Sequence, residues 1–211
     1  MDNQLIAQKH KTNIRLNYFN KYYYKCIESC KAYFKNVKHD RKKFGLDIRD
    51  DLYLINLYIG LSYKKINKLK LSKQYIQKSI KYSLNDTQLH VAIKQLAELY
   101  AQWHMIDKAI HSYKQSLHYY RKIKDTKSRA NVLFNIAVIK NRPDHMQKII
   151  FALERLDNIE KYYELIIQQY VDLLQYLFKH KKDNEAIGLL NGITNLNVKA
   201  QVCQQLYQQI A

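Results

Sequence analysis

Two stretches of the chain repeat one spacing of small and large residues at a distance of 37 positions. The first stretch holds Gly60, Tyr63, Ser72, Ile76 and Ser79, and the second holds Ala97, Tyr100, Ala109, Tyr113 and Ser116 at the same intervals. Two antiparallel helices approach closely only where small side chains face each other, and large side chains fill the space beside them. The spacing therefore predicts consecutive pairs of antiparallel helices.

The scarcity of turn-forming residues supports an all-α fold. The sequence has 4 glycines and 1 proline among 211 residues. An all-β chain needs many glycine and proline turns, and a doubly wound α/β chain needs glycines where strands lead into helices. With 47% hydrophobic and 26% charged residues, the chain is expected to fold rather than stay disordered.

The spacing resembles that of the tetratricopeptide (TPR) repeat. Repeats are predicted at about 53–86, 90–123, 130–161 and 167–200, of which the third is degenerate and carries the only proline, Pro143. The resemblance implies an all-α, right-handed helical-repeat solenoid. We expect a helical hairpin with a charged connector over 1–50, four TPR-like hairpins over 51–200, and the end of a capping helix over 201–211.

Outside the repeats, helices are predicted over Gln4–Leu16 and Lys21–Val37, with the segment Lys38–Arg49 as the connector. A Gln-rich helix over Val198–Ile210 is expected to cap the stack.

The long repeat step and the degenerate third repeat also resemble the repeat domains of Rap, NprR and PlcR-type peptide-pheromone sensors of low-GC Gram-positive bacteria. This resemblance implies a regulator that docks a peptide or protein in the concave groove formed by the first helix of each repeat. It also implies that groove asparagines hold the peptide backbone, which makes Asn135 the first candidate. Residues 1–50 are too short for a convincing helix-turn-helix output domain, which argues against a transcription factor.

The groove positions combine cations, amides and apolar side chains. Asparagine and glutamine can satisfy both the N–H and the C=O of an extended peptide, and lysine and arginine can pair with carboxylates. The alternative is that these residues are solvated helix faces. The candidate binding residues are Tyr58, Lys64, Lys94, Gln95, Asn131, Asn135, Arg142 and Lys179, with Phe134 and Phe178 as further apolar anchors.

The net charge of +18 is concentrated in the first 150 residues, which carry +19 against −1 in the last 61. Such a field attracts an acidic partner. One alternative function is nucleic-acid binding through a basic patch made of Lys38, Arg41, Lys42, Lys43, Lys68 and Lys70, which lies near Tyr22, Tyr23, Tyr24, Tyr33, Tyr63 and Tyr75. Another is a scaffold that forms homodimers through its neutral, leucine-rich C-terminal repeat. The charge can also reflect the codon usage of an AT-rich genome.

No pattern in the sequence supports catalysis, so we expect a non-enzymatic protein without a cofactor. Phosphate-binding loops, the zinc-protease motif and a nucleophile elbow are missing. Three cysteines, Cys26, Cys30 and Cys203, make neither a disulfide framework nor a zinc site. The sequence shows no signal pattern and no apolar run near 20 residues, which favours a cytoplasmic protein that does not bind membranes.

Overall fold

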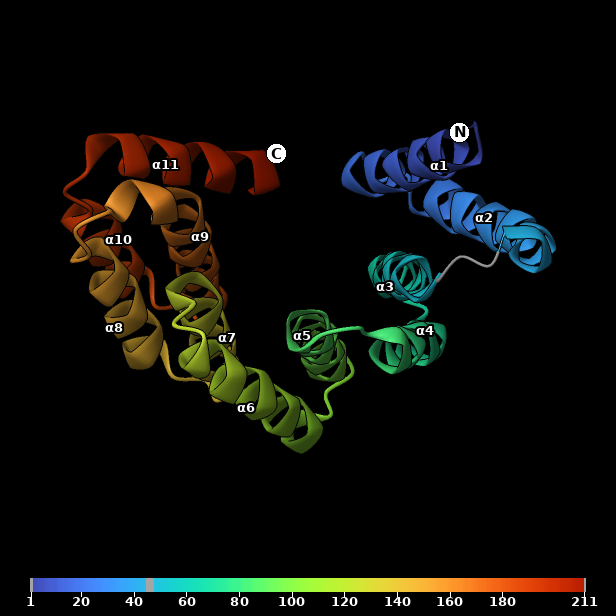
Figure 1. The fold of residues 1–211 in the computed structure, drawn as a ribbon. Coiled ribbons are helices and arrows are strands. Elements are labelled where there is room, and N and C mark those ends of the chain that lie inside the picture. Colours follow the sequence, from blue (N-terminus) through green and yellow to red (C-terminus); the bar gives the residue numbers. More distant parts are fainter. Residues whose placement is uncertain (1, 45–47, 211) are drawn as a thin grey trace. The chain divides into compact units, whose positions relative to one another are not determined.

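The computed structural model describes the backbone of residues 2–44 and 48–210, and the side chains of residues 8–35 and 48–208. Within these ranges every regular element is a helix (Figure 1). The chain divides into two compact units, Met1–Tyr119 and Tyr120–Ala211.

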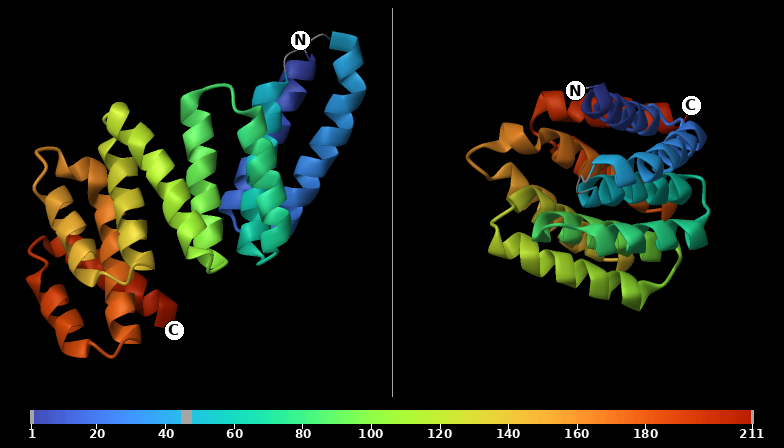
Figure 2. Two further views of the ribbon diagram at one scale, coloured as in Figure 1. Left: turned by 90° about the horizontal axis from the view of Figure 1, so that it is seen from below. Right: turned by 45° about the vertical axis from the view of Figure 1, so that its right-hand side comes forward.

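The first unit is a series of antiparallel hairpins. Its helices are α1 (Asp2–Phe19), α2 (Tyr23–Phe44), α3 (Arg49–Lys65), α4 (Leu69–Tyr82), α5 (Asp86–Gln102) and α6 (Ile106–Lys122), the last of which crosses into the second unit. We call the odd-numbered helices A helices and the even-numbered ones B helices. Within this unit α3 contacts both α1 and α5, so three A helices are neighbours (Figure 2).

The second unit is built around one central helix. Its elements are α7 (Thr126–Ile139), α8 (Pro143–Glu154), the 3₁₀ helix η1 (Ile159–Tyr162), α9 (Tyr163–Lys179), α10 (Asp183–Gly192) and α11 (Leu196–Ile210). Helix α9 contacts α7, α8, α10 and α11. It is apolar on most of its circumference, and Leu173, Leu174 and Leu177 lie in the core of the unit.

The repeat spacing predicted from the sequence is confirmed by burial. The small residues face the partner helix and are fully buried; they are Ser72, Ser79, Ala97, Ala109 and Ser116. Gly60 lies so close to α4 that a Cβ built on it would be 2.7 Å from Ile76 Cγ1. Ser72 Oγ also donates a hydrogen bond of 2.8 Å to the Gly60 carbonyl. The α3–α4 hairpin therefore packs through backbone contact at Gly60.

Six interhelical turns explain how the chain manages with so few glycines. A non-glycine residue adopts a left-handed backbone at each turn, with φ between 55° and 63°; these residues are Lys21, Asn67, His104, Lys124, Asn141 and Lys181. At each turn the next N–H reaches back to a carbonyl five residues earlier, as Met105 N does to Tyr100 O at 2.9 Å. This hydrogen bond is the Schellman closure, which usually employs glycine.

The N-terminal helices differ from the prediction in length. Helix α2 runs to Phe44, so the prediction of a connector is wrong for residues 38–44, while residues 45–47 lie outside the described part. Lysine and arginine are good helix formers, so a charged segment can be part of a helix as easily as part of a loop. No helix in the described ranges is long and apolar enough to cross a bilayer.

Candidate functional site

Polar side chains of the neighbouring A helices α3 and α5 meet around Glu98. Lys64, in the last turn of α3, donates to Gln95 Oε1 at 2.8 Å and pairs with Glu98 Oε2 at 2.8 Å. The Lys94 ammonium is 3.8 Å from Glu98 Oε1. The structure thus brings together three residues that the sequence assigns to the groove, and we call this group the Glu98 cluster.

Burial gives the members of the Glu98 cluster different roles. The Lys64 side chain is 10% exposed, and an ammonium this buried is stable only beside acceptors, so it fixes the positions of Gln95 and Glu98. The Lys94 side chain is 20% exposed. Because two ammonium groups share one carboxylate, the cluster keeps a net positive charge that can attract a carboxylate of a ligand.

The third A helix of this unit reaches the same surface through its aromatic rings. Tyr58 of α3 is half-buried and packs edge-on against Tyr18 of α1, with ring centroids 5.3 Å apart. Burial raises the pKa of Tyr18 to about 12, and the negative charge of Glu98 contributes to that rise. Glu98 therefore acts electrostatically on side chains from all three A helices of the first unit.

In the second unit, two asparagines stand one turn apart on the A helix α7. Asn135 Nδ2 donates to Asn131 Oδ1 at 3.1 Å, and both side chains are half-buried. In the described part of the chain, no hydrogen bond uses Asn131 Nδ2 or Asn135 Oδ1. The pair therefore offers one donor group and one acceptor, which are the two groups that a peptide unit needs.

A carboxyl group with a perturbed pKa lies on the neighbouring A helix α9. Gln168 Nε2 donates to Asp172 Oδ1 at 2.8 Å. Burial raises the pKa of Asp172, and the hydrogen bond from Gln168 only partly opposes this effect. Neither residue is among the candidate binding residues named from the sequence, because no sequence signal marks the altered pKa.

Two candidate residues lie at the ends of their helices. Arg142 is in the turn before α8, not on an A helix as the register predicts, because α7 already ends at Ile139. It makes two hydrogen bonds of 3.1 Å to Asp144, and they lower the pKa of that carboxyl to about 2. Lys179 is the exposed last residue of α9.

The two phenylalanines predicted as groove anchors differ in their burial. Phe134 is 2% exposed and belongs to the core of the second unit, so its prediction as a groove anchor is wrong. Phe178 is 42% exposed and can still contact a ligand.

The predicted basic patch is described only in part. Lys68 and Lys70 are exposed at the start of α4. The other members lie in α2, and their side chains are outside the described residues; they are Lys38, Arg41, Lys42 and Lys43.

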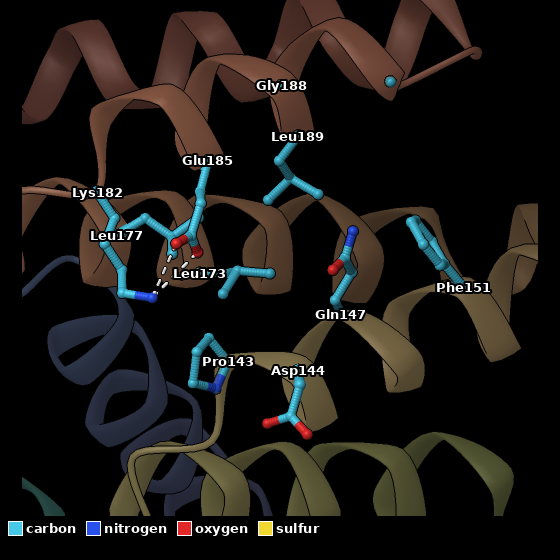
Figure 3. Close-up of a pocket in the computed structure, with 11 residues that line it drawn as sticks. Pro143, Asp144, Gln147, Phe151, Leu173, Leu177, Lys182, Glu185, Gly188 and Leu189 are labelled. Carbon is cyan, nitrogen blue, oxygen red and sulfur yellow. Dashed lines mark hydrogen bonds and ion pairs between the residues drawn. The ribbon is translucent and has the colours of Figure 1, made fainter.

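The sequence did not predict a groove between the B helices α8 and α10, whose floor is α9 (Figure 3). Its volume is about 510 Å³. Leu173 and Leu177 form the floor, while Phe151 lies at one end and the Lys182–Glu185 ion pair of 2.9 Å at the other (Figure 3). The sequence feature that could have indicated this groove is the pair Gly188 and Gly192 on α10. Both line the groove, and a Cβ added to either would meet nothing within 4 Å.

Metal ligands and reactive thiols do not form a second site in the part of the chain that the structure describes. No group of three His, Cys, Asp or Glu side chains there is placed to hold a metal ion. Cys26 and Cys30 are both fully buried in the first unit, and a hydrogen bond from Cys30 lowers the pKa of Cys26 to about 7.

No protein-family model matches the sequence, and no curated protein matches it. Solved structures do match. A Rap protein complexed with competence and sporulation factor superposes with a TM-score of 0.70 and 13% identity, over 94% of this chain and 55% of that protein. The chain thus spans about half the length of the Rap protein.

Two other similar structures are matched along most of their own length. BtubC (BKLC) from P. vanneervenii has a TM-score of 0.60 and 11% identity, over 96% of this chain and 90% of its own. A putative kinesin light chain with TPR-like repeats from Podosopora anserina has a TM-score of 0.59 and 13% identity, over 97% and 96%. At these identities the likeness concerns the fold, and the chain is accordingly a TPR-like helical-repeat protein.

Proposed function

We propose that the chain is a non-enzymatic binding module that docks an extended peptide, or an extended segment of a protein partner, on the A helices of its repeats. The observation that carries this proposal is the Asn131–Asn135 pair. Its unused donor and acceptor are half-buried on an A helix, where water competes less for them than on an open surface. An extended backbone supplies both partners.

The proposed ligand is acidic. Lys+Arg exceed Asp+Glu by 36 to 18 in the whole chain, and the Glu98 cluster adds a local positive charge. A field of this sign raises the rate at which acidic ligands meet the surface. The Rap protein of similar fold is complexed with competence and sporulation factor, which supports a signalling peptide as the ligand of this chain.

The test is a selection of peptides from a display library that presents random decapeptides, with the whole chain as bait. Selected peptides are synthesised with a fluorescent label and titrated against wild type, Asn135→Ala and Lys94→Ala. Matched controls are Asn184→Ala and Lys114→Ala, which change exposed residues of the B helices α10 and α6.

We expect acidic sequences to be enriched. Asn135→Ala should weaken their binding about tenfold, because the loss of a hydrogen bond in a half-buried site costs about 1–1.5 kcal/mol. Lys94→Ala should weaken binding and reduce its salt dependence, whereas both controls should bind as wild type does. A selection without enriched sequences, or peptides that bind both A-helix variants as tightly as wild type, would contradict the proposal.

A further inference from the structure

The turn between α1 and α2 exposes four large apolar side chains within nine residues. Phe19 is 70% exposed, Tyr24 63%, Tyr22 55% and Leu16 52%. The other exposed large apolar residues in the described ranges are at least nine positions apart in sequence. Scattered exposed apolar residues are normal, but a concentration at one place marks an interaction site.

The exposed rings stand on a firmly closed turn. Lys21 N donates to Tyr18 O at 3.0 Å, and Tyr22 N donates to Asn17 O at 2.8 Å. The Asn17 side chain in turn donates to Ser29 Oγ of α2 at 3.2 Å. Because both helix ends are hydrogen-bonded here, the exposure of the rings does not come from a frayed helix.

The two helices that meet at this turn carry an excess of cations, and Lys21 and Lys25 lie at the turn itself. From Lys9 to Lys31 the sequence has Glu28 as its single acidic residue against Lys9, Lys11, Arg15, Lys21, Lys25 and Lys31. Among the residues described, no carboxylate pairs with Lys21 or Lys25. The Lys25 ammonium lies 5.2 Å from the centroid of the Tyr22 ring. Aromatic rings and two ammonium groups without a carboxylate partner therefore lie together on one exposed turn.

We propose that this α1–α2 tip, formed by Leu16, Phe19, Lys21, Tyr22, Tyr24 and Lys25, binds single-stranded nucleic acid. Unpaired bases would stack on the exposed faces of Phe19, Tyr22 and Tyr24, while phosphates pair with Lys21 and Lys25. A duplex offers the phosphates but keeps its bases stacked on each other.

Other acidic partners fit the tip less well. An acidic protein surface would pair with the lysines and leave the ring faces in water. An anionic bilayer accepts tyrosine rings at the level of its headgroups, but stable attachment needs a larger apolar surface than Leu16 and Phe19 offer. Single-stranded nucleic acid engages both kinds of side chain.

The test is a titration of fluorescent 12-nucleotide oligouridylate and oligothymidylate, and of a 12-base-pair duplex, by the whole chain in 50 to 300 mM salt. The first variant is Phe19→Ala/Tyr22→Ala/Tyr24→Ala, which keeps every charge. Its matched control is Tyr207→Ala, because Tyr207 is 75% exposed on α11 of the other unit. The second variant is Lys21→Gln/Lys25→Gln, with Lys108→Gln/Lys114→Gln on the exposed side of α6 as the control for lost charge. Phe19→Ala alone serves if the triple variant does not fold.

We expect a single-stranded probe to bind more tightly than the duplex. Each lost ring should weaken binding about fivefold or more, and the triple variant about 100-fold or more, with the salt slope unchanged. Lys21→Gln/Lys25→Gln should reduce that slope by about 1.4, twice the value per phosphate contact. The Tyr207 control should bind as wild type does.

The proposal is overturned if the duplex binds as tightly as the single strands, or if the triple variant binds as wild type does. It is also overturned if neither oligonucleotide binds while vesicles of phosphatidylserine and phosphatidylcholine do. Asn135 and Lys94, which the peptide test changes, lie outside the α1–α2 tip, so the two proposals can fail independently.

Discussion

Alanine should have opposite effects on stability at two glycines of the chain, Gly60 and Gly188. Replacing glycine by alanine inside a helix stabilises it by about 1 kcal/mol when the new methyl group has room. At Gly188 an added Cβ meets nothing within 4 Å, so Gly188→Ala should gain about that amount.

At Gly60 the methyl group has no room. It would lie 2.7 Å from Ile76 Cγ1, 3.1 Å from Ile76 N and 3.3 Å from Ser72 O. Ile76 is fully buried, and the other two atoms are backbone, so α3 and α4 must move apart. Overpacking of this kind costs about 1–3 kcal/mol, and the buried hydrogen bond from Ser72 to Gly60 adds about 1 kcal/mol if it breaks. After the propensity gain is subtracted, Gly60→Ala should lose about 1–3 kcal/mol.

Urea unfolding measures both effects. Trp103, the only tryptophan of the chain, reports on the first unit through its fluorescence, and circular dichroism follows all helices. The unfolding midpoint should fall for Gly60→Ala and rise for Gly188→Ala, with little change in slope. The second repeat has Ala97 where the first has Gly60, so sequence comparison alone would treat alanine as harmless. If Gly60→Ala were as stable as wild type, the backbone contact between α3 and α4 would be refuted.

Three further changes test separate parts of the structure. Tyr33→Phe removes the 2.7 Å hydrogen bond to Asp51, which also pairs with Lys11. The variant should lose about 1 kcal/mol of unfolding free energy and melt at a lower temperature. A wild-type melting temperature would contradict this link between α1, α2 and α3. Asp172→Asn should stabilise the second unit at pH 7, because burial raises the pKa of the carboxyl group and penalises its ionised form. The gain in stability should vanish below about pH 4, where the carboxyl group is protonated in the folded and the unfolded chain. A gain that does not depend on pH would refute the burial argument. His104→Gly should leave stability unchanged or raise it by up to about 1 kcal/mol, since φ is 56° there, and a clear loss in urea unfolding would contradict the left-handed turn.

The sequence predicted the helical hairpins well because close helix packing leaves a direct trace in residue size. Small residues at Ser72, Ala97 and Ala109 are buried at the helix crossings as expected. The turns left no such trace, because residues such as Lys124 and Lys181 take the left-handed position that glycine usually marks. The length of α2 was missed for a related reason, since charged residues suit both helices and loops.

The candidate site was predicted only where helix register is enough. Lys64, Lys94 and Gln95 meet because two predicted A helices are adjacent. Phe134 was misplaced because register in the degenerate third repeat does not show which side of the helix faces the core. Tyrosines posed the same difficulty: Tyr33 is 3% exposed and Tyr24 is 63% exposed, although both stand in similar basic sequence. Burial of such residues depends on tertiary packing, which short-range patterns do not encode.

The most direct test of the central claim, that the A helices bind an extended peptide, is photo-crosslinking with a selected peptide. A decapeptide from the display selection would carry benzoylphenylalanine at each position in turn, and mass spectrometry would locate the crosslinked residues. We predict crosslinks on A helices, either near Lys94 on α3 and α5 of the first unit or near Asn135 on α7 and α9 of the second unit. Crosslinks confined to the B helices, for example in the groove between α8 and α10, would contradict the account.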